Sequence, residues 1–276
     1  MRLLQMKIIV LGSTGMAGRY ISNYLKQYFK VVELNRNHFD ALNVNLNYFD
    51  KIINQNDVII NCVGILKPYI DTIGIAETHV INTTFPNLLN DICKQNDARF
   101  IHICSDCVFK GDKGNYSEID ECDATDIYAI TKKRVVNGTI IRTSFIGNDS
   151  NDDGVGLMKW LINNQNKTIN GYVNCLWNGI TALELSKQIY KIILHENFWS
   201  GVRHIFSSKT ISKYELCELI NKVYDLNINI NKQNAQSIEG TEIAGNLNRS
   251  LCSIYNKPVT RSFETQLEEL KKYDSK

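Results

Sequence analysis

Short apolar runs alternate, along the first half of the chain, with longer stretches in which apolar residues recur every three or four positions. Continuous apolar runs are typical of strands buried on both faces of a sheet, and the longer stretches are typical of amphipathic helices. The pattern predicts strands at 7–11, 31–34, 58–63, 100–104 and 139–142 and helices at about 16–28, 78–94 and 126–137. Strands and helices that alternate in this way predict an α/β fold with a doubly wound parallel sheet.

The second half of the chain has a different pattern. Helical periodicity recurs at 183–194, 213–224 and 263–272, and Asn- and Ser-rich connections join these stretches. We therefore predict that residues 1–147 form the parallel sheet, to which later strands near 172–206 can return. Residues 148–276 are predicted to form a smaller α/β region that binds the substrate.

The composition is that of a globular protein, because 43% of the 276 residues are hydrophobic and 22% are charged. A chain of this length buries roughly 70% of its unfolded surface, so it needs no disulfide or metal for stability.

No apolar run approaches about 20 residues and the first residues lead straight into a predicted strand. We therefore expect no transmembrane helix or signal peptide, and a cytoplasmic protein. The net charge of +2 is dispersed, so nucleic acid and membrane are not expected partners.

The eight cysteines are scattered along the chain and are expected to be reduced. Cys104 and Cys107 form a C-x-x-C pair, which is compatible with a redox pair or half of a zinc site. The other cysteines supply no second pair at the spacing of metal ligands, and Cys104 ends a predicted strand. We therefore expect a structural role for this pair and no metal.

Three glycines follow the first predicted strand, in the order Gly12, Gly15 and Gly18, and a predicted helix begins at once. In this context the first glycine permits a tight turn, the second lets a pyrophosphate approach the backbone, and the third lets helix and strand pack closely. The N-terminus of the helix then holds the phosphates. A simple turn between strand and helix needs only one or two glycines. The motif thus predicts a dinucleotide-binding Rossmann domain.

The residue after the second predicted strand selects between the two nicotinamide dinucleotides. A site for NAD places an acidic residue there, to bind the ribose 2′-hydroxyl. Here the position falls on Asn35, and Arg36 follows; an amide does not repel a 2′-phosphate and a guanidinium binds one. NADP(H) is therefore favoured over NAD(H). Two alternatives stay open, namely that Arg36 is an ordinary loop residue, or that Glu33 is the acid after a shift of register by two.

Candidate acid–base residues lie near the last two predicted strands of the sheet. Tyr128 and Lys132 share one face of the helix between them, and Ser105 follows the strand before it. The carboxyl ends of parallel strands are where ligands bind in such folds. An ammonium near a phenol lowers the phenol's pKa from about 10 toward the range useful for acid–base catalysis. We predict that Tyr128 and Lys132 act together, with the Ser105 hydroxyl orienting a carbonyl oxygen.

These motifs, in this order, resemble those of the extended short-chain dehydrogenase/reductase superfamily, and more narrowly those of the dTDP-4-dehydrorhamnose reductase family. Residues 104–109 (CSDCVF) resemble that family's STDYVF, and the resemblance continues at 114–118 (GNYSE), 123–128 (DATDIY), 142–144 (RTS) and 174–181 (NCLWNGIT). It covers nearly the whole chain. It implies hydride transfer from NADPH to C4 of a nucleotide-linked 4-keto-6-deoxyhexose, dTDP- or UDP-linked and rhamnose-type or N-acetylated, in deoxysugar biosynthesis for surface glycans.

The resemblance also implies residue roles. Tyr128 would protonate the developing alkoxide, Lys132 would hold the nicotinamide ribose, and Ser105 would orient the ketone. The residues expected to contact the cofactor are Gly12, Ser13, Thr14, Gly15, Met16, Gly18, Asn35, Arg36, Asn43, Cys62, Val63, Gly64, Asn82, Tyr128, Lys132 and Arg142. The residues expected to contact the substrate are Ser105, Asp106, Cys107, Trp177 and Arg249. Trp177 is a candidate for stacking on the base and Arg249 for pairing with the pyrophosphate, although a structural role is an alternative for each.

One residue that departs from the family's usual sequence bears on which reaction is expected. Cys107 stands where the reductases usually have tyrosine and where 4,6-dehydratases have glutamate, so dehydratase chemistry is not expected. We find no match to the acidic residues that bind magnesium in some members.

Two other functions stay open. One is a sugar-nucleotide 4-epimerase of the same fold. The other is a non-catalytic NADP-binding regulatory subunit of the methionine adenosyltransferase type, which the complete set of Ser105, Tyr128 and Lys132 disfavours. The sequence leaves open the nucleotide, the sugar's stereochemistry at C3 and C5, and the oligomeric state, for which a homodimer is one option.

Overall fold

The computed structural model describes residues 6–135, 137–149, 154–236 and 246–275. The chain divides into two compact units that are interleaved along the sequence. The first unit comprises Met1–Cys104, Ile127–Arg142 and Ser186–Arg203, and the second comprises Ser105–Asp126, Thr143–Leu185 and His204–Lys276. The assignment of 1–147 to the cofactor and 148–276 to the substrate stays a prediction about function.

A six-stranded sheet in the order β10-β5-β4-β3-β1-β2 forms the centre of the first unit. Its strands are β1 (Lys7–Leu11), β2 (Lys30–Leu34), β3 (Val58–Asn61), β4 (Arg99–Ser105), β5 (Thr139–Thr143) and β10 (Gly201–His204). The pairs β1–β2, β1–β3 and β3–β4 are parallel, as predicted. Ile8, Ile59 and Ile60 are completely buried, since both faces of these strands are covered. The predicted α/β fold is confirmed.

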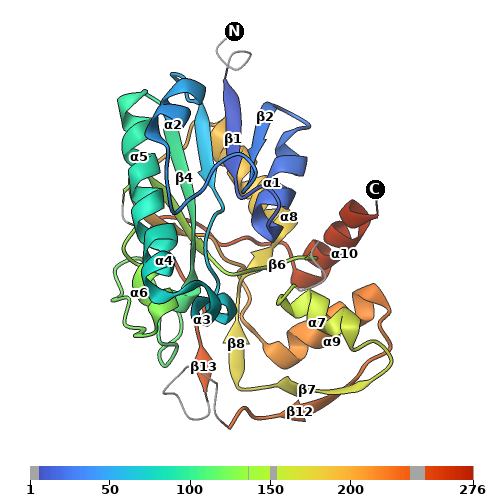
Figure 1. The fold of residues 1–276 in the computed structure, drawn as a ribbon. Helices are drawn as coiled ribbons and strands as arrows, with labels where there is room; N and C mark the ends of the chain where they lie inside the picture. Colours follow the sequence, from blue (N-terminus) through green and yellow to red (C-terminus); the bar gives the residue numbers. More distant parts are fainter. Residues whose placement is uncertain (1–5, 136, 150–153, 237–245, 276) are drawn as a thin grey trace. The chain divides into compact units, whose positions relative to one another are not determined.

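Helices cover this sheet. They are α1 (Met16–Leu25), α2 (Leu46–Ile52), α3 (Ile70–Ile73), α4 (Ile75–His79), α5 (Phe85–Gln95), α6 (Ile127–Lys132) and α8 (Ala182–Leu194), with a 3₁₀ turn η2 (Lys67–Tyr69) and a π-helical turn η3 (Val80–Thr84). Figure 1 shows α5 on one side of the sheet, and α1 and α8 are in contact through the Tyr24 and Tyr190 rings. An apolar cluster that includes Phe49 and Phe85 packs α2 and α5 against β1 and β3.

Four predicted boundaries in this unit were wrong. The first helix ends at Leu25, and the strand predicted at 58–63 ends at Asn61, so Cys62 and Val63 lie beyond its end. The helix predicted at 78–94 is divided, because the π-helical turn η3 precedes α5, whose first turn contains a proline. The helix predicted at 126–137 ends at Lys132. Gly138 has φ +90°, which L side chains rarely adopt, so the chain leaves the helix before it enters β5.

Within the part of the chain that the structure describes, the second unit is built from small sheets and three further helices. The sheets pair β8 (Cys175–Trp177) with β11 (Ile211–Ser212) and β13 (Leu247–Asn248), β7 (Thr168–Tyr172) with β12 (Asn229–Gln233), and β6 (Phe145–Ile146) with β9 (Ile180–Thr181). The helices are α7 (Leu157–Asn163), α9 (Lys213–Tyr224) and α10 (Phe263–Asp274), and a 3₁₀ turn η4 (Asp106–Val108) follows β4. The helix predicted at 213–224 is confirmed, and the one predicted at 263–272 extends to Asp274.

All eight cysteines are free thiols. Across the described ranges no helix is both long enough and apolar enough to cross a membrane. In the same ranges, no group of three or more His, Cys, Asp or Glu side chains is placed to hold a metal ion.

Candidate active site

The glycine loop between β1 and α1 has the shape that a dinucleotide requires. Gly12 has φ +75°, and a Cβ there would lie 3.1 Å from the Val63 nitrogen. A Cβ on Gly18 would lie 2.2 Å from the Gly12 carbonyl oxygen, so only glycine lets the helix pack this closely. A Cβ on Gly15 would meet only that same oxygen, at 3.5 Å, so the space beside Gly15 is open. The loop therefore fits a pyrophosphate beside Gly15.

The N-terminus of α1 adds backbone N–H donors to this glycine loop. Gly15 is the N-cap residue and supplies no side chain to bind the first N–H groups of the helix. Ser13 is buried and does not cap these N–H groups, because its hydroxyl donates to the Leu34 carbonyl at the end of β2. Thr14 is exposed and Met16 is half-buried. Helix N–H groups without a capping side chain suit an anionic ligand.

The end of β2 lies against the glycine loop, because the Gly12 and Ser13 nitrogens both donate to the Leu34 carbonyl. Asn35 is the first residue after the strand. Its backbone N–H lies 3.2 Å from Nδ1 of His38, and its side chain accepts from the Asn37 nitrogen. This closes a short turn on which Arg36 is exposed.

The alternative acid, Glu33, is engaged elsewhere, because its carboxylate lies 2.5 Å from the Lys26 ammonium. Asn43 lies further along the same loop, exposed, and donates to the Asp40 carboxylate. This contact lowers the pKa of Asp40.

Residues Cys62 to Gly64 form the loop at the end of β3. The Cys62 nitrogen donates to the Leu11 carbonyl, so this loop is held beside the glycine loop. Asn82, completely buried in η3, accepts from the Ile65 nitrogen at 2.7 Å and donates to the Ile65 carbonyl at 3.0 Å. Its amide also donates to the Thr131 hydroxyl at 3.2 Å, so one asparagine joins the loop after β3 to helix α6.

Helix α6 holds Tyr128 and Lys132 four residues apart, and both side chains are buried. The helix is fixed in place because the Thr83 hydroxyl donates to the Thr131 carbonyl at 2.7 Å. The Lys132 ammonium nitrogen Nζ lies 3.0 Å from the Ile103 carbonyl oxygen, and it would lie 3.5 Å from a Cβ on Gly64. Burial lowers the pKa of Lys132. The lysine thus reaches the same loop that carries Cys62 and Val63.

The second unit contains a buried carboxylate with two cations. Ser105 accepts from the Cys107 nitrogen and donates to the Asp106 carboxylate at 3.2 Å, so its hydroxyl caps the turn η4. Burial raises the pKa of Asp106, and the charges of Arg249 and Lys213 oppose this rise. Arg249 donates from Nε to the Phe109 carbonyl at 2.8 Å, and its Nη1 lies 3.8 Å from the Cys107 sulfur.

Trp177 is buried in the second unit. Its indole N–H donates to the Ser144 hydroxyl at 2.8 Å, its ring stacks on Phe263, and the Lys213 ammonium lies 4.9 Å from the ring centroid. Burial lowers the pKa of Lys213, and Asp106 is the first of the groups that oppose this.

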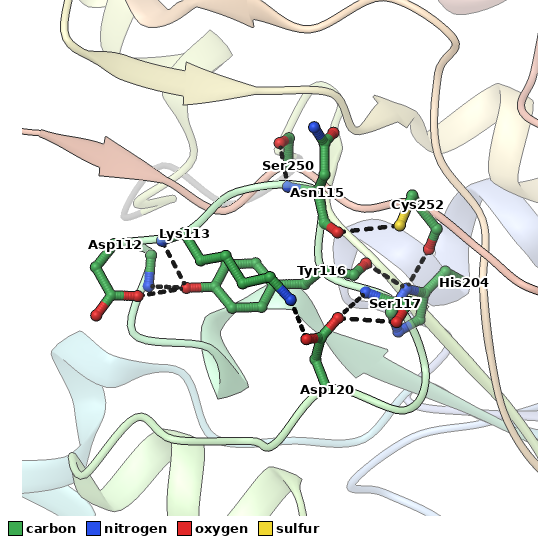
Figure 2. A network of polar contacts seen from close by, with 10 residues as sticks. Asp112, Lys113, Asn115, Tyr116, Ser117, Asp120, His204, Ser250 and Cys252 are labelled. Carbon is green, nitrogen blue, oxygen red and sulfur yellow. Dashed lines mark hydrogen bonds and ion pairs between the residues drawn. The ribbon is translucent and has the colours of Figure 1, made fainter.

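A polar network supports the segment that carries Arg249 (Figure 2). The Tyr116 hydroxyl accepts from the Gly111 and Lys113 nitrogens and donates to Asp112. The Tyr116 nitrogen donates to the Ser250 carbonyl, and the Asn115 nitrogen donates to the Ser250 hydroxyl at 2.9 Å. Ser250, the residue after Arg249, is therefore held by two backbone N–H groups of the second unit, those of Asn115 and Tyr116.

The structure divides the predicted residues between the units without exception. Every predicted cofactor residue, from Gly12 to Arg142 in β5, belongs to the first unit, and every predicted substrate residue belongs to the second. Sequence analysis missed Asn61, His102, Thr131 and Lys213. The signal for Asn61 and His102 was present, because each is a polar residue inside an otherwise apolar strand. Lys213 had no such signal, since its neighbours are distant in sequence.

The family model and the curated relatives that match this chain point to the same family. The chain matches the model of the RmlD substrate binding domain over residues 6–272. Curated dTDP-4-dehydrorhamnose reductases from two strains of Mycobacterium tuberculosis are 27% identical over 136 residues, which is 46% of this chain and 43% of each relative. The match therefore spans less than half the length of these curated relatives.

Solved structures share the fold. A dTDP-4-dehydrorhamnose reductase from Bacillus anthracis in complex with NADP has a TM-score of 0.79 at 18% identity, over 97% of this chain and 99% of that one. The ortholog from Clostridium acetobutylicum has a TM-score of 0.76 at 20% identity, over 98% and 100%. A UDP-N-acetylglucosamine 4-epimerase from Methanobrevibacter ruminantium has a TM-score of 0.75 at 17% identity, over 98% of each chain. Reductases and an epimerase share this fold, so the fold alone does not select the reaction.

Proposed function

The chain belongs to the RmlD substrate binding domain family, and from this premise we propose that it reduces the 4-keto group of a nucleotide-linked 4-keto-6-deoxyhexose, with NADPH as the reductant. The observation that carries the proposal is the joint geometry of the first unit. A glycine loop that fits a pyrophosphate and a Tyr128–Lys132 pair are held around the same loop after β3. The names of the family relatives favour a dTDP-linked, rhamnose-type sugar.

Each residue has a separate task in this reaction. Bound NADPH would supply the hydride. Tyr128 donates its phenolic proton to the oxygen that becomes the new hydroxyl, and such a donor contributes on the order of 10²–10⁴ in rate. Lys132 binds the ribose that carries the nicotinamide, and Ser105 orients the ketone oxygen. Alignment of the groups supplies a large part of the remaining acceleration.

The turn after β2 supports a preference for NADPH. Asn35 carries no charge that would repel a 2′-phosphate, and Arg36 is exposed on a turn closed by Asn35 and His38. Glu33 forms an ion pair with Lys26, and the first charged side chain after the end of β2 is the guanidinium of Arg36. A guanidinium binds phosphate through paired N–H donors.

The charges of the second unit support an anionic substrate. Two cations, Arg249 and Lys213, stand beside one buried carboxylate, Asp106. When all three are ionised, one positive charge is in excess. An excess of positive charge suits the diphosphate of a nucleotide sugar.

The test is the absorbance of NADPH at 340 nm with dTDP- and UDP-linked 4-keto-6-deoxyhexoses, each with and without an N-acetyl group. Net oxidation with one of them identifies the reaction, the nucleotide and the sugar together. If the protein binds NADPH tightly and oxidises none with any substrate, the reductase proposal is overturned. A 4-epimerase or a regulatory binding subunit then takes its place, and recovery of an epimerised sugar separates these two.

A further inference from the structure

A cavity of about 330 Å³ lies at one edge of the central sheet, inside the first unit. Arg99 is the first residue of β4, Thr139 is the first residue of β5, and Ser200 directly precedes β10. These three strands are neighbours in the sheet. The cavity volume is at the lower end of the range of about 300–1,000 Å³ that is usual for small-molecule sites. The cavity is therefore large enough for a small ligand.

This edge of the sheet is opposite to the edge of the proposed dinucleotide site. Arg99 pairs in register with Val58, the first residue of β3, whereas the loop at 62–64 follows the last residue of that strand. Strand β4 has seven residues. A strand rises about 3.3 Å per residue, so the two ends of β4 are about 20 Å apart. A ligand in the cavity therefore occupies a second site, separate from the one proposed for the dinucleotide.

The side chains around the cavity carry positive charge. Arg99 and Lys94 line the cavity and are exposed. The guanidinium carbon of Arg203 lies 4.8 Å from the centroid of the Trp199 ring, which also lines the cavity. Among the described residues of the lining, none is Asp or Glu. An excess of positive charge around a cavity favours an anionic ligand.

Two carboxylates lie near the cavity, but neither cancels its positive charge. The Asp91 carboxylate lies 3.9 Å from the Lys94 ammonium, and an ion pair between two exposed side chains contributes little. Asp57 is close to the Cys93 thiol of the lining, but its carboxylate lies 2.6 Å from the Lys7 ammonium. Burial, and then the charge of Asp57, raise the pKa of Cys93 to about 12, so this thiol is uncharged at neutral pH.

Two consecutive aromatic residues, Phe198 and Trp199, form an aromatic wall of the cavity. The Trp199 nitrogen donates to the Thr139 hydroxyl at 3.2 Å, and this hydroxyl donates to the Trp199 carbonyl at 2.8 Å. The Trp199 indole N–H donates to the Gly201 carbonyl at 3.0 Å. The guanidinium carbon of Arg99 lies 5.6 Å from the centroid of the Phe198 ring. Contacts within the protein thus hold the aromatic wall, as is usual for a largely pre-formed site.

One buried carboxamide adds neutral hydrogen-bonding groups to the lining. Asn90 in α5 is 2% exposed, and its Nδ2 lies 3.5 Å from the Asp91 carboxylate, which makes this contact a weak one. A carboxamide carries both donors and an acceptor, and the hydrogen-bonding edge of a nucleobase does as well. The cavity therefore combines cations, aromatic rings and a carboxamide.

We propose that this cavity binds a nucleoside phosphate. The aromatic wall contacts the base, because aromatic side chains bind bases of every type through their rings. Arg99 and Lys94 bind the phosphate, and a guanidinium does so through paired N–H donors. The base distinguishes this ligand from inorganic phosphate, and the phosphate distinguishes it from a free nucleoside.

The site can be tested by NMR of the full-length, dinucleotide-free protein labelled with ¹⁵N-tryptophan. The chain has three tryptophans, and the indole signal of Trp199 is assigned with the Trp199→Phe variant. The probes are dTMP, thymidine and inorganic phosphate. We expect dTMP to move the Trp199 signal saturably, at lower concentrations than either of the other two probes. A Trp199 signal that millimolar dTMP leaves unmoved, or that thymidine or phosphate moves equally well, overturns the proposal.

The Arg99→Gln variant tests whether the cavity is the place of binding. A hydrogen bond to a charged group is lost, so the dTMP midpoint of the Trp199 signal is expected to rise by about 10- to 100-fold. The matched control is Arg134→Gln, because Arg134 is an exposed arginine of the same unit that does not line the cavity. This control is expected to leave the midpoint unchanged.

An unchanged midpoint in Arg99→Gln, or an equal rise in Arg134→Gln, overturns the proposal. If Arg99→Gln does not fold, Lys94→Gln replaces it, since Lys94 is exposed on α5, and an unchanged midpoint there is equally decisive. The measurement needs no turnover. A failure of the proposed reduction therefore leaves this result intact, and absence of dTMP binding leaves the proposed reduction intact.

Discussion

At the scale of single residues, Gly15 and Gly18 of the glycine loop are required for different reasons. Substitution of each by alanine is expected to have a different effect. A Cβ on Gly18 would lie 2.2 Å from a backbone oxygen, whereas a Cβ on Gly15 would enter open space. We expect Gly18→Ala to lower the free energy of unfolding by about 1–3 kcal/mol, because helix and strand are forced apart. We expect Gly15→Ala to keep its stability and to lose affinity for NADPH, because the methyl group occupies the place of a phosphate. Urea unfolding and fluorescence titration measure the two effects, and equal stability losses in both variants would contradict this assignment.

Tyr128 is the residue on which the proposed chemistry depends most. We expect Tyr128→Phe to bind NADPH normally and to lose turnover by about 10²–10⁴, because the proton donor is removed and the ring is kept. Steady-state kinetics with direct NADPH titration measure both quantities. Near-normal turnover would remove Tyr128 from the role of acid.

Arg36 tests the preference for the phosphorylated dinucleotide. A hydrogen bond to a charged group contributes about 1.5–3 kcal/mol, so Arg36→Ala is expected to weaken NADPH binding by about 10- to 100-fold. Affinity for NADH is expected to change little, because NADH has no 2′-phosphate. Binding titrations of both dinucleotides give the ratio, and a parallel loss for both would show that Arg36 acts on the loop and not on the phosphate.

At the scale of elements, the loop between η4 and α6 depends on one half-buried carboxylate, that of Asp120 (Figure 2). Asp120 accepts from the Lys113 ammonium and from the N–H and hydroxyl of Ser117, and these contacts lower its pKa to about 2. The pKa of an unfolded Asp is about 4. Because the folded value is the lower one, the stabilisation is complete above pH of about 4 and is lost as the pH falls toward 2.

The corresponding variant is Asp120→Asn, which cannot lose a proton. We expect its free energy of unfolding to depend less on pH between about 4 and 2 than that of the unaltered protein. Urea midpoints measured across this range test the expectation. Parallel pH profiles for the two proteins would show that the Asp120 contacts do not contribute in solution.

At the scale of the whole molecule, the first unit includes a segment from the second half of the sequence, Ser186–Arg203. Strand β10 pairs next to β5 at the edge of the six-stranded sheet, and residues 186–194 of α8 belong to the same unit. The Thr139 hydroxyl donates to the Trp199 carbonyl at 2.8 Å, and Ile189 and Ile193 of α8 are buried. A fragment of residues 1–147 lacks all of these contacts. We expect it to unfold without a cooperative transition in urea, followed by far-UV circular dichroism, and a sigmoidal transition would contradict this view.

Much of the fold could be predicted because its signals are local. Apolar strands and helical periodicity depend on neighbours within a few residues, and so does the glycine loop. Helix α9 begins at Lys213, as predicted, because Ser212 and Glu215 form a capping box at its start. The end of α6 was predicted five residues too late, because the position of β5 and the backbone of Gly138 decide where that helix stops.

The sequence by itself therefore determined five strands of the central sheet, the longer helices, the glycine loop and the Tyr128–Lys132 spacing, since hydrogen bonding within an element and the burial of one face act over short distances. Only the tertiary structure decided which distant groups meet. It placed Lys213 beside Asp106, joined Asn82 to Thr131, and set His102 behind Lys132. These contacts depend on how whole elements pack, and no pattern among neighbouring residues in the sequence predicts them. The same packing decides the protonation of buried groups, because burial and the polarity of neighbouring donors set their pKa values.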